Sequence, residues 1–366
     1  MTKIEHSRLR TWIEIDPRAV AHNYRTVRKL LGPKVGLMAV VKSNAYGHGL
    51  IQFSKLLARL GVDWLGVDSI VEAVALRRAG VKKEILVLGY TQPANLSVAA
   101  RDDIVVTISS FHSLRQLFPL SHPPQFHLKL DTGMHRQGFI LEDYKKLLPM
   151  LKHLPLTGIY SHLAALGSGS QSAVRAQVTE FKKFLVAVEN FKLTKHLVST
   201  GGAIAYPNAR FDLARIGLGL YGLWPNDDLR RRFGEKIKLQ PVLVWKTIIS
   251  EVKILTSGGT VGYDFTERVK PGTKMAVCPV GYWHGFPRAL SSIGEVMVRG
   301  HLVKVIGRVS MDMIVIDVTK IKNLRVGDVV TLIGDGLPAE HLARLAQTSP
   351  YEIITRLNPL IQKFYY

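Results

Sequence analysis

The chain has 366 residues, of which 47% are apolar and 21% are charged, an ordinary balance for a globular protein of two domains or of one large barrel with an appendage. It contains no run of about 18 apolar residues, so the sequence predicts no membrane-spanning helix. The N-terminal segment Met1–His6 lacks an apolar stretch, so no signal peptide is expected. The single cysteine, Cys278, excludes an internal disulfide and fits a reducing cytoplasm, and its apolar neighbours predict a buried structural thiol.

The net charge of +21 would suit a protein that binds nucleic acid. The basic residues are nevertheless spread along the chain, and the densest group is Arg230–Arg232 with Lys236 and Lys238. The sequence has no zinc-finger spacing, no RNP-like string and no basic heptad. The pattern therefore favours a solvated basic surface that attracts anionic small molecules, without a nucleic-acid partner. Salt-dependent binding to DNA at physiological ionic strength would support the opposite interpretation.

Short apolar runs alternate with longer amphipathic runs through about the first 225 residues. Helical spacing is present at 69–79 and at 173–191. Eight strands that alternate with helices predict an α/β fold, a (β/α)₈ barrel of the TIM type. The expected strands are 37–41, 64–67, 85–88, 104–108, 126–130, 158–161, 196–198 and 214–216.

The pattern changes at about residue 239, after which strand-like runs follow one another closely, with turn signals such as Pro271-Gly272 between them. The polar and charged segment 225–238 carries a proline, so the domain boundary is expected there. The sequence thus predicts a barrel over 12–236 and a mostly β C-terminal domain over 237–366, with residues 1–11 as a candidate addition to the second domain. The expected strands of that domain are 242–252, 274–280, 294–299, 302–309, 313–318 and 329–333.

A lysine stands at the exit of one apolar run. Lys42 follows Leu37–Val41 in the string A-V-V-K-S-N-A-Y-G-H-G, and Asn44, Gly47 and Gly49 then break the strand into a loop. An ammonium at the end of a buried strand is costly unless it is paired or loses its proton, and an amine that has lost its proton is a nucleophile. On its own, such a lysine is more often a surface residue whose ammonium group reaches water.

The string around Lys42 resembles the cofactor-lysine motif of alanine racemases, in which the lysine carries pyridoxal 5′-phosphate (PLP) as a Schiff base. The resemblance extends over nearly the whole chain and implies a barrel followed by a β domain, which is also what the strand pattern predicts. Further motifs recur in the order expected for the family: H-L-K-L-D-T-G-M-H-R at 127–136, F-D-L-A-R-I-G-L-G-L-Y-G at 211–222, T-V-G-Y-D at 260–264, C-P-V-G-Y-W-H-G-F-P-R at 278–288 and G-R-V-S-M-D at 307–312.

The resemblance implies two catalytic residues, Lys42 and Tyr263, because racemisation removes a proton from one face of Cα and delivers another to the opposite face. It further implies that Arg215, which interrupts an apolar run, contacts the PLP pyridine nitrogen and leaves it unprotonated. Arg136 would bind the substrate carboxylate and the phenolic oxygen of PLP, for which the guanidinium fork is suited. Lys129, often carbamylated in the family, would hold Arg136 in place. An ion pair of Arg136 with Asp131 is the plain alternative.

A second group of residues is implied to contact the cofactor phosphate: Tyr46, Thr200, Gly217, Leu218 and Tyr351. Thr200, Gly217 and Leu218 follow the last two expected strands, where barrels commonly bind phosphate.

The remaining roles implied by the family are spread over both domains. His162 would lie near the cofactor ring and contact the arginine beneath it. Tyr282 would stand at the entrance of the site, and Met311 would offer a backbone N–H to the substrate carboxylate. Asp312 would support the catalytic base.

Three positions depart from the family pattern: His135, where glycine is frequent, Ser199, where asparagine is usual, and His284, where aspartate is common. They leave open a racemase of broader specificity, or one that acts on serine. A non-catalytic PLP-binding protein of the single-barrel type is less compatible with the sequence, because the β domain with Tyr263 argues against it. A barrel decarboxylase would need a catalytic cysteine in the β domain, and Cys278 suits that role poorly.

Two further classes of site find little support. No H-x-x-H or C-x-x-C pair is present, so no metal site is expected. The glycines of 217–222 fit G-x-G-x-x-G, but a proline and a charged segment follow them in place of a long helix, which disfavours a dinucleotide site.

Taken together, the resemblance implies a cytoplasmic, PLP-dependent isomerase that interconverts L-alanine and D-alanine and supplies D-alanine for peptidoglycan. It also implies a symmetric homodimer with shared active sites, in which the tyrosine of one subunit serves the cofactor of the other. No membrane partner is expected.

Overall fold

The computed structural model describes residues 8–366, and the expectation about a signal peptide in Met1–His6 lies outside them. The chain divides into two compact units. The barrel unit contains Ala19–Ala45 and Leu50–Gln240, and the β unit contains the chain up to Arg18, Tyr46–Gly49 and Pro241–Tyr366. Within the described part of the chain, no helix combines the length and the apolar character needed to cross a membrane.

The barrel unit is built on a sheet of eight strands, all paired in parallel, in the order β8-β7-β6-β5-β4-β3-β2-β9. Backbone hydrogen bonds from Asp212 N–H to Lys195 O and from Arg215 N–H to Val198 O, both 3.0 Å, join the last two strands and close the sheet. The predicted (β/α)₈ barrel is thereby confirmed. The strands are β2 (Gly36–Val40), β3 (Trp64–Val67), β4 (Glu84–Val87), β5 (Val105–Ile108), β6 (Phe126–Lys129), β7 (Leu156–Tyr160), β8 (Thr194–His196) and β9 (Leu213–Ile216).

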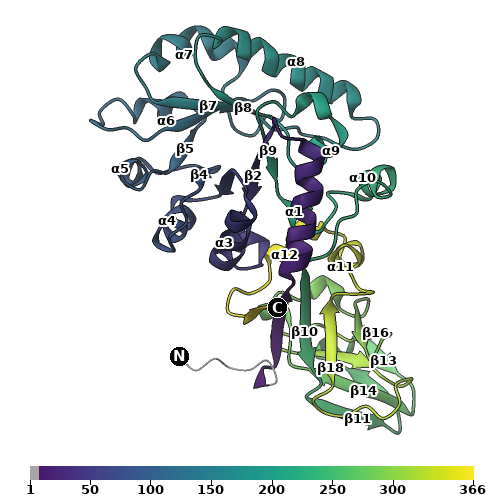
Figure 1. Ribbon diagram of the computed structural model, residues 1–366. Helices are drawn as coiled ribbons and strands as arrows, with labels where there is room; N and C mark the ends of the chain where they lie inside the picture. Colours follow the sequence, from purple (N-terminus) through teal and green to yellow (C-terminus); the bar gives the residue numbers. More distant parts are fainter. Residues whose placement is uncertain (1–7) are drawn as a thin grey trace. The chain divides into compact units, whose positions relative to one another are not determined.

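Helices lie outside the barrel strands (Figure 1). The local sequence explains α4 well, because Ser69 caps its first turn by accepting the Glu72 N–H, and Arg77 and Arg78 in its last turn favour the helix dipole. A short helix, α10, occupies the polar segment 225–238 in which the domain boundary was expected. The helices are α1 (Pro17–Leu31), α3 (Leu50–Leu60), α4 (Ile70–Arg78), α5 (Leu96–Arg101), α6 (Phe111–Arg115), α7 (Tyr144–Leu151), α8 (Gln171–Ala187), α9 (Thr200–Ala205) and α10 (Asp227–Phe233).

The barrel has a packed core. Met38, Leu86, Val105 and Leu213, which come from four different strands, form a cluster of buried side chains. Strands buried on both sides read as continuous apolar runs, and this is why the strand pattern could be recognised in the sequence. The carboxyl ends of these parallel strands all lie at one edge of the barrel, and this edge positions the candidate site.

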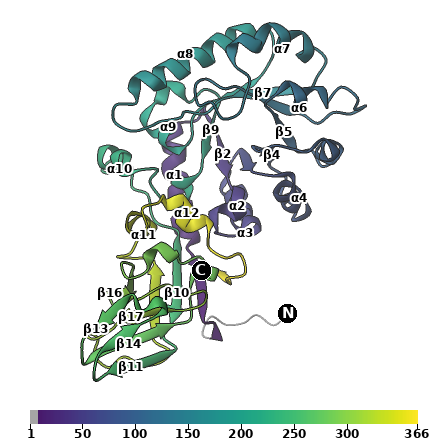
Figure 2. The same ribbon diagram turned by 180° about the vertical axis from the view of Figure 1, so that it is seen from behind.

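The β unit contains a sheet of nine strands in the order β11-β14-β17-β16-β15-β18-β10-β1-β19, together with a separate hairpin, and confirms the mostly β domain (Figure 2). Two short helices that were not expected, α11 (Ala339–Leu345) and α12 (Pro350–Thr355), also belong to it. The strands of the sheet are β1 (Thr11–Ile15), β10 (Leu243–Ile248), β11 (Glu251–Leu255), β14 (Thr273–Cys278), β15 (Glu295–Val298), β16 (His301–Ile306), β17 (Ile314–Asp317), β18 (Val329–Ile333) and β19 (Lys363–Tyr365), and the hairpin is β12 (Gly259–Val261) with β13 (Glu267–Val269).

The N-terminal strand β1 joins the sheet of the β unit, although all of its residues except Thr11 fall in the segment that the sequence assigned to the barrel. It pairs antiparallel with β10 and parallel with β19, with Ile13 opposite Trp245 and Lys363. Trp12, Ile13 and Ile15 are buried there, so this strand contributes to the core of the sheet.

Candidate active site

The residues expected to act in the barrel all lie at or after the carboxyl ends of its strands. Parallel strands place those ends at one edge, so the fold brings together residues that are far apart in the sequence. The residues at this edge are Lys42 after β2, Lys129 and Arg136 at and after β6, His162 after β7, Thr200 after β8, and Arg215 with Gly217 and Leu218 at and after β9.

The backbone after Lys42 is a left-handed turn. Ser43, Asn44, Ala45 and Tyr46 have φ of 55°, 57°, 50° and 48°, in the region that non-glycine residues rarely adopt. Each such residue costs about 1 kcal/mol, so the surrounding structure must hold the turn. Asn44 does so on both sides, because its N–H donates to Glu72 Oε1 at 3.1 Å and its Oδ1 accepts the Leu50 N–H at 2.9 Å.

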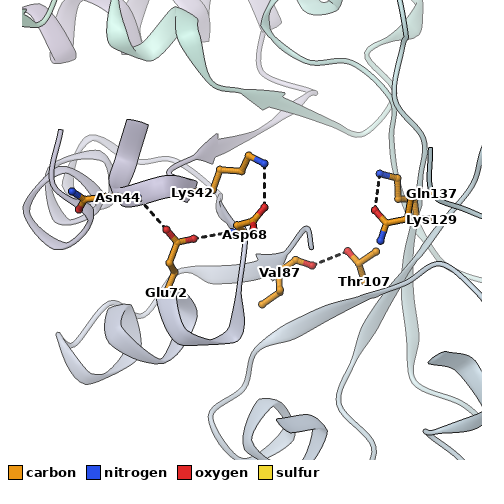
Figure 3. Close-up of polar contacts among 8 residues, drawn as sticks. All are labelled: Lys42, Asn44, Asp68, Glu72, Val87, Thr107, Lys129 and Gln137. Atoms are coloured by element: carbon orange, nitrogen blue, oxygen red, sulfur yellow. Dashed lines mark hydrogen bonds and ion pairs between the residues drawn. The ribbon is translucent and has the colours of Figure 1, made fainter. Parts of the chain in front are cut away.

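Lys42 forms an ion pair with Asp68, the residue that follows β3. The Lys42 Nζ lies 3.1 Å from Asp68 Oδ1, and the two side chains are 38% and 54% exposed (Figure 3). Glu72 accepts the Asp68 N–H at 2.9 Å with its second oxygen. One glutamate therefore holds the loops that carry both partners of the ion pair.

Lys129 points from β6 and is almost completely buried. Its Nζ donates to Gln137 Oε1 at 3.4 Å (Figure 3) and lies 5.4 Å from the centre of the Tyr160 ring. Burial lowers the pKa of Lys129 to about 8, and the positive charges of Arg215 and Arg136 act in the same direction. A substantial fraction of this amine is therefore neutral near pH 8, and the neutral amine is the form that can be carbamylated.

Asp131 holds the backbone of the loop after β6 and does not form the alternative ion pair with Arg136. Its Oδ1 accepts N–H bonds from Gly133, Met134 and His135, and its Oδ2 accepts the Arg136 N–H. Burial tends to raise the pKa of Asp131, but these four hydrogen bonds outweigh it and lower the pKa. His135 has φ of 52°, which explains why glycine suits this position.

Arg215 lies on β9 as a buried cation surrounded by uncharged acceptors. Its Nη1 donates to His196 Nδ1 at 2.8 Å, and its Nη2 donates to His162 Nδ1 at 3.1 Å and to Ser161 O and Leu197 O. Burial lowers its pKa to about 10, so the guanidinium stays charged at neutral pH. Within residues 8–366, no carboxylate pairs with Arg215, and its hydrogen bonds leave the Nε–H for another acceptor.

The hydrogen bond from Arg215 fixes the tautomers of two further histidines. Because His196 Nδ1 accepts from Arg215, its hydrogen is on Nε2, which donates to His127 Nδ1 at 2.9 Å. The His127 hydrogen is then on Nε2, which has no hydrogen-bond partner. Burial lowers the pKa of His127 and that of His162 to about 3, and lowers that of His196 well below its usual range, so all three are neutral at pH 7.

Tyr160 packs against this network from β7. Its ring stacks on His196 with centres 4.6 Å apart, and its OH donates to Thr107 Oγ1 at 2.9 Å, while Thr107 donates to Val87 O (Figure 3). The Arg215 guanidinium lies 5.1 Å from the ring centre. The Tyr160 ring that packs against Arg215 is therefore held in place by stacking and by hydrogen bonds.

The turn after β9 is held by Thr200, the first residue of α9. Thr200 Oγ1 accepts N–H bonds from Gly217 at 3.1 Å and Gly219 at 3.3 Å. The Gly217 N–H, which the family resemblance directs at a phosphate, thus donates to this hydroxyl. The hydrogen of the Thr200 hydroxyl remains available to donate to an anion.

The β unit brings Tyr46 and Tyr351 together, two residues expected to contact phosphate. Their rings meet edge to face, with centres 5.6 Å apart. A side chain at Gly47 would place Cβ 2.1 Å from Ile354 O, so glycine is required for this close approach. Burial raises the pKa of Tyr351 to about 12, so its hydroxyl is a proton-bearing donor at neutral pH.

Tyr263 lies at the tip of the β12–β13 hairpin and is 68% exposed. Asp264, the next residue, forms an ion pair with Arg308 at 2.8 Å. Gly262, with φ of 78°, lies against the backbone of Arg308, where a Cβ would be 3.2 Å from its nitrogen. The loop after β16 therefore supports the hairpin that presents the tyrosine.

The same loop contacts the turn that carries Tyr282. The Tyr282 N–H donates to Ser310 O and the Trp283 N–H donates to Met311 O, both at 3.0 Å. Tyr282 and Met311 are both exposed. His284 stabilises the turn by accepting the Gly281 N–H with Nδ1; burial lowers the pKa of His284, and the nearby Asp312 opposes this shift.

Several residues of this arrangement were missed in the sequence. Asp68, Tyr160 and His196 each stand at the end of a buried strand, as Lys42 and His162 do, and this position was the available signal. Glu72 completes the pattern Ser-x-x-Glu that begins at Ser69 and signals the start of a helix. Here the Glu72 carboxylate accepts the Asp68 N–H and also the Asn44 N–H of the neighbouring loop.

Models of two protein families match the chain. Residues 15–225 match "Alanine racemase, N-terminal domain" and residues 242–365 match "Alanine racemase, C-terminal domain". The chain is 34% identical to the alanine racemase of Leptospira interrogans over 369 residues, covering 96% of this chain and 95% of that protein. It is 36% identical to the alanine racemase of Syntrophobacter fumaroxidans over 356 residues, covering 94% of each.

Solved structures agree with these matches. The alanine racemase of Clostridium difficile 630 superimposes with a TM-score of 0.92 at 28% identity, covering 100% of this chain and 97% of that chain. The alanine racemase of Streptomyces coelicolor gives 0.90 at 31% identity, with 98% of both chains covered. The enzyme of Bartonella henselae, solved with covalently bound pyridoxal phosphate, gives 0.89 at 27% identity, covering 98% of this chain and 100% of that chain.

Proposed function

The chain belongs to the alanine racemase family and is an isomerase, and we propose that it interconverts L-alanine and D-alanine with PLP attached to Lys42. The observation that carries this proposal is the buried Arg215, a cation whose partners are uncharged and whose Nε–H is left for an acceptor. A pyridine nitrogen is such an acceptor.

The residues present fit PLP group by group. Lys42 supplies an amine at the carboxyl edge of β2. Arg215 would serve the pyridine nitrogen as a donor that keeps its proton, and the His162 Nδ1 lies 3.1 Å from its Nη2. Thr200, Leu218, Tyr46 and Tyr351 are proposed to contact the phosphate, supported by the free hydroxyl hydrogen of Thr200 and the protonated hydroxyl of Tyr351. Gly217, whose N–H donates to Thr200, is proposed to hold that hydroxyl in place.

When bound, PLP withdraws electrons from Cα of the amino acid and so acidifies its hydrogen. Arg215 would keep that withdrawal moderate, because it would donate to the ring nitrogen without protonating it. A moderate electron sink would favour return of a proton to Cα over transamination. This property suits a racemase better than a transaminase.

Two residues are proposed to move the protons. Lys42 acts on one face of Cα, and Tyr263 of the partner subunit acts on the other. The exposure of Tyr263 at a hairpin tip supports a role toward another chain, as does its support by Arg308 through Asp264. Asp312, next to Met311, is proposed to assist this base.

The substrate carboxylate is proposed to be held by Arg136 and by the Met311 N–H, with Tyr282 at the entrance. Lys129, in carbamylated form, would be an anion that pairs with Arg136, and the lowered pKa of its amine supports this modification. Alanine is the proposed substrate.

The homodimer, the cytoplasmic location and the supply of D-alanine for peptidoglycan are proposed from the family. The single cysteine is compatible with a reducing compartment, since Cys278 is a buried free thiol whose pKa burial raises to about 12.

The test combines spectroscopy with assays of racemisation. The purified protein should show a visible absorption band of bound PLP, and borohydride should fix the cofactor on the peptide that contains Lys42. Lys363 is a built-in control, because burial lowers the pKa of this second lysine to about 8 as well. Cofactor on Lys363, or wild-type racemisation by Lys42→Ala, would disprove the proposal.

A further inference from the structure

One carboxylate lies next to the proposed catalytic lysine, and the roles implied by the family do not use it. Strands β2 and β3 are parallel neighbours, with Val40 opposite Gly66. Lys42 and Asp68 follow these strands, so the fold places them side by side at the carboxyl edge of the barrel. Their side chains point toward one another, and Nζ and Oδ1 are 3.1 Å apart (Figure 3).

The backbone of Asp68 is held in place by hydrogen bonds of both its N–H and its carbonyl group. Its N–H donates to Glu72 Oε2 at 2.9 Å, and its carbonyl accepts the Gly89 N–H at 3.1 Å. A Cβ at Gly89 would lie 2.3 Å from that carbonyl oxygen, so this contact with the loop after β4 needs glycine. Helix α4 and the loop after β4 thus hold the backbone from which the Asp68 side chain extends.

The other charges near Lys42 are mostly positive. Lys129, Arg136 and Arg215 interact electrostatically within this part of the barrel, and the charge of Lys42 contributes to the lowered pKa values of Lys129 and His162, after burial and the arginines. The carboxylate of Asp131 is occupied by four backbone N–H groups. In the part of the chain that the structure describes, Asp68 is therefore the carboxylate that neutralises Lys42 directly.

We propose that Asp68 is a positioning residue for Lys42. Whenever Lys42 is not bonded to the cofactor, Asp68 stabilises it as an ammonium and holds its Nζ at the carboxyl edge of the barrel. This inference rests on the proposed function. When the substrate has displaced Lys42, the lysine takes a proton from Cα in one direction and returns a proton in the other. Both directions pass through a state in which Lys42 is an ammonium beside a carbanion, and a nearby carboxylate stabilises that state.

Two measurements on Asp68→Asn test this. The first uses the full-length protein after removal of PLP, and follows the labelling of Lys42 by trinitrobenzenesulfonate with mass spectrometry, with exposed Lys82 as internal reference. The amide keeps the shape of the side chain but loses its charge, so the ion pair that occupies the Lys42 Nζ is lost. Labelling of Lys42 should become about fivefold faster, the effect expected for a half-exposed ion pair.

The second measurement is racemisation by the holoenzyme. L- and D-alanine are mirror images with an equilibrium constant of one, so kcat/KM must change by the same factor in both directions. We expect a decrease of about fivefold. Faster labelling together with slower racemisation distinguishes the proposed role from a merely structural one, which would lower activity without making Lys42 more reactive.

Two controls accompany the variant. Asp63→Asn removes a similar ion pair, Asp63 with Arg28 at 3.3 Å, at the amino end of the same strand, and should leave both readouts unchanged. Asp68→Glu keeps the charge and should stay within about twofold of wild type in labelling. If Asp68→Asn does not fold, as judged by circular dichroism, Asp68→Ser replaces it.

An unchanged or slower labelling of Lys42, or an unchanged kcat/KM, overturns the inference while an active wild type leaves the proposed function intact. An inactive wild type refutes the proposed function instead, and the labelling measurement then still decides whether Asp68 stabilises the ammonium.

Discussion

The Arg215 guanidinium donates to His196 Nδ1 at 2.8 Å, and this single hydrogen bond sets the state of the network beneath the candidate site. It makes His196 a donor to His127, and it leaves the His127 Nε2–H without a partner. The buried charge of Arg215 is therefore stabilised by hydrogen bonds to neutral groups and not by a carboxylate. The arrangement keeps Arg215 cationic and rigid, as a fixed donor to a ring nitrogen requires.

Arg215→Glu should slow racemisation by at least about 100-fold, because a preorganised donor is lost. A carboxylate at this position favours a protonated ring nitrogen, which prolongs the life of the carbanion and allows transamination. Pyruvate should therefore form alongside the alanine enantiomer, as measured with lactate dehydrogenase. Arg215→Lys, which keeps a cation, should be slow without producing pyruvate. An unchanged ratio of pyruvate to racemised alanine in the Glu variant would remove Arg215 from the cofactor site.

Replacement of His196 and replacement of His127 should lower the free energy of unfolding by different amounts. His196→Phe leaves a charged donor of Arg215 and the acceptor of His127 unpaired, and should reduce the free energy of unfolding by about 2–3 kcal/mol. His127→Phe removes one hydrogen bond but also a donor that has no partner, and should change it by less than about 1 kcal/mol. Urea unfolding of both variants checks this. Equal losses would contradict the assigned tautomers.

Stability should rise with pH across the acidic range. The pKa values of His127 and His162 are near 3 in the folded protein and 6.5 in an unfolded chain, so the unfolded state binds more protons between these values. The histidine contribution is therefore complete above pH 6.5 and is lost as the pH falls toward 3. Each histidine contributes a slope of up to about 1.4 kcal/mol per pH unit.

Urea unfolding at pH 7 and pH 5 measures this slope, and His127→Phe should reduce it. A slope that the variant does not change would show that His127 is not held neutral in the fold.

Most strands of the barrel could be predicted because they are buried on both sides, and their sequences are short apolar runs. Lys42 and Arg215 were found for the same reason, since a charge in or beside such a run is conspicuous. Strand β8, T-K-H, is only partly buried, and the sequence placed it two residues too late, at 196–198. The family resemblance supplied the roles, and the confirmed fold places the barrel residues at one edge.

Pairing between distant segments could not be predicted. Nothing in the sequence of strand β1, T-W-I-E-I, specifies β10 and β19 as its neighbours. The partnership of Asp68 with Lys42 likewise depends on the register of β2 against β3. The left-handed turn at 43–46 contains no glycine, so its conformation follows from contacts made by Asn44 and Glu72 and not from local preference.

The proposed sharing of sites between two subunits leads to a complementation experiment. Lys42→Ala and Tyr263→Phe should each be inactive as homodimers. In a mixed dimer, one site contains both intact residues and the other contains neither. Mixing under conditions of subunit exchange should therefore restore about a quarter of the wild-type activity per subunit when half of the dimers are mixed. Exchange is verified with differently tagged chains, and mixing each variant with itself serves as the control. If mixed dimers form and remain inactive, both bases act within one chain, and the exposed tyrosine of the hairpin serves its own barrel.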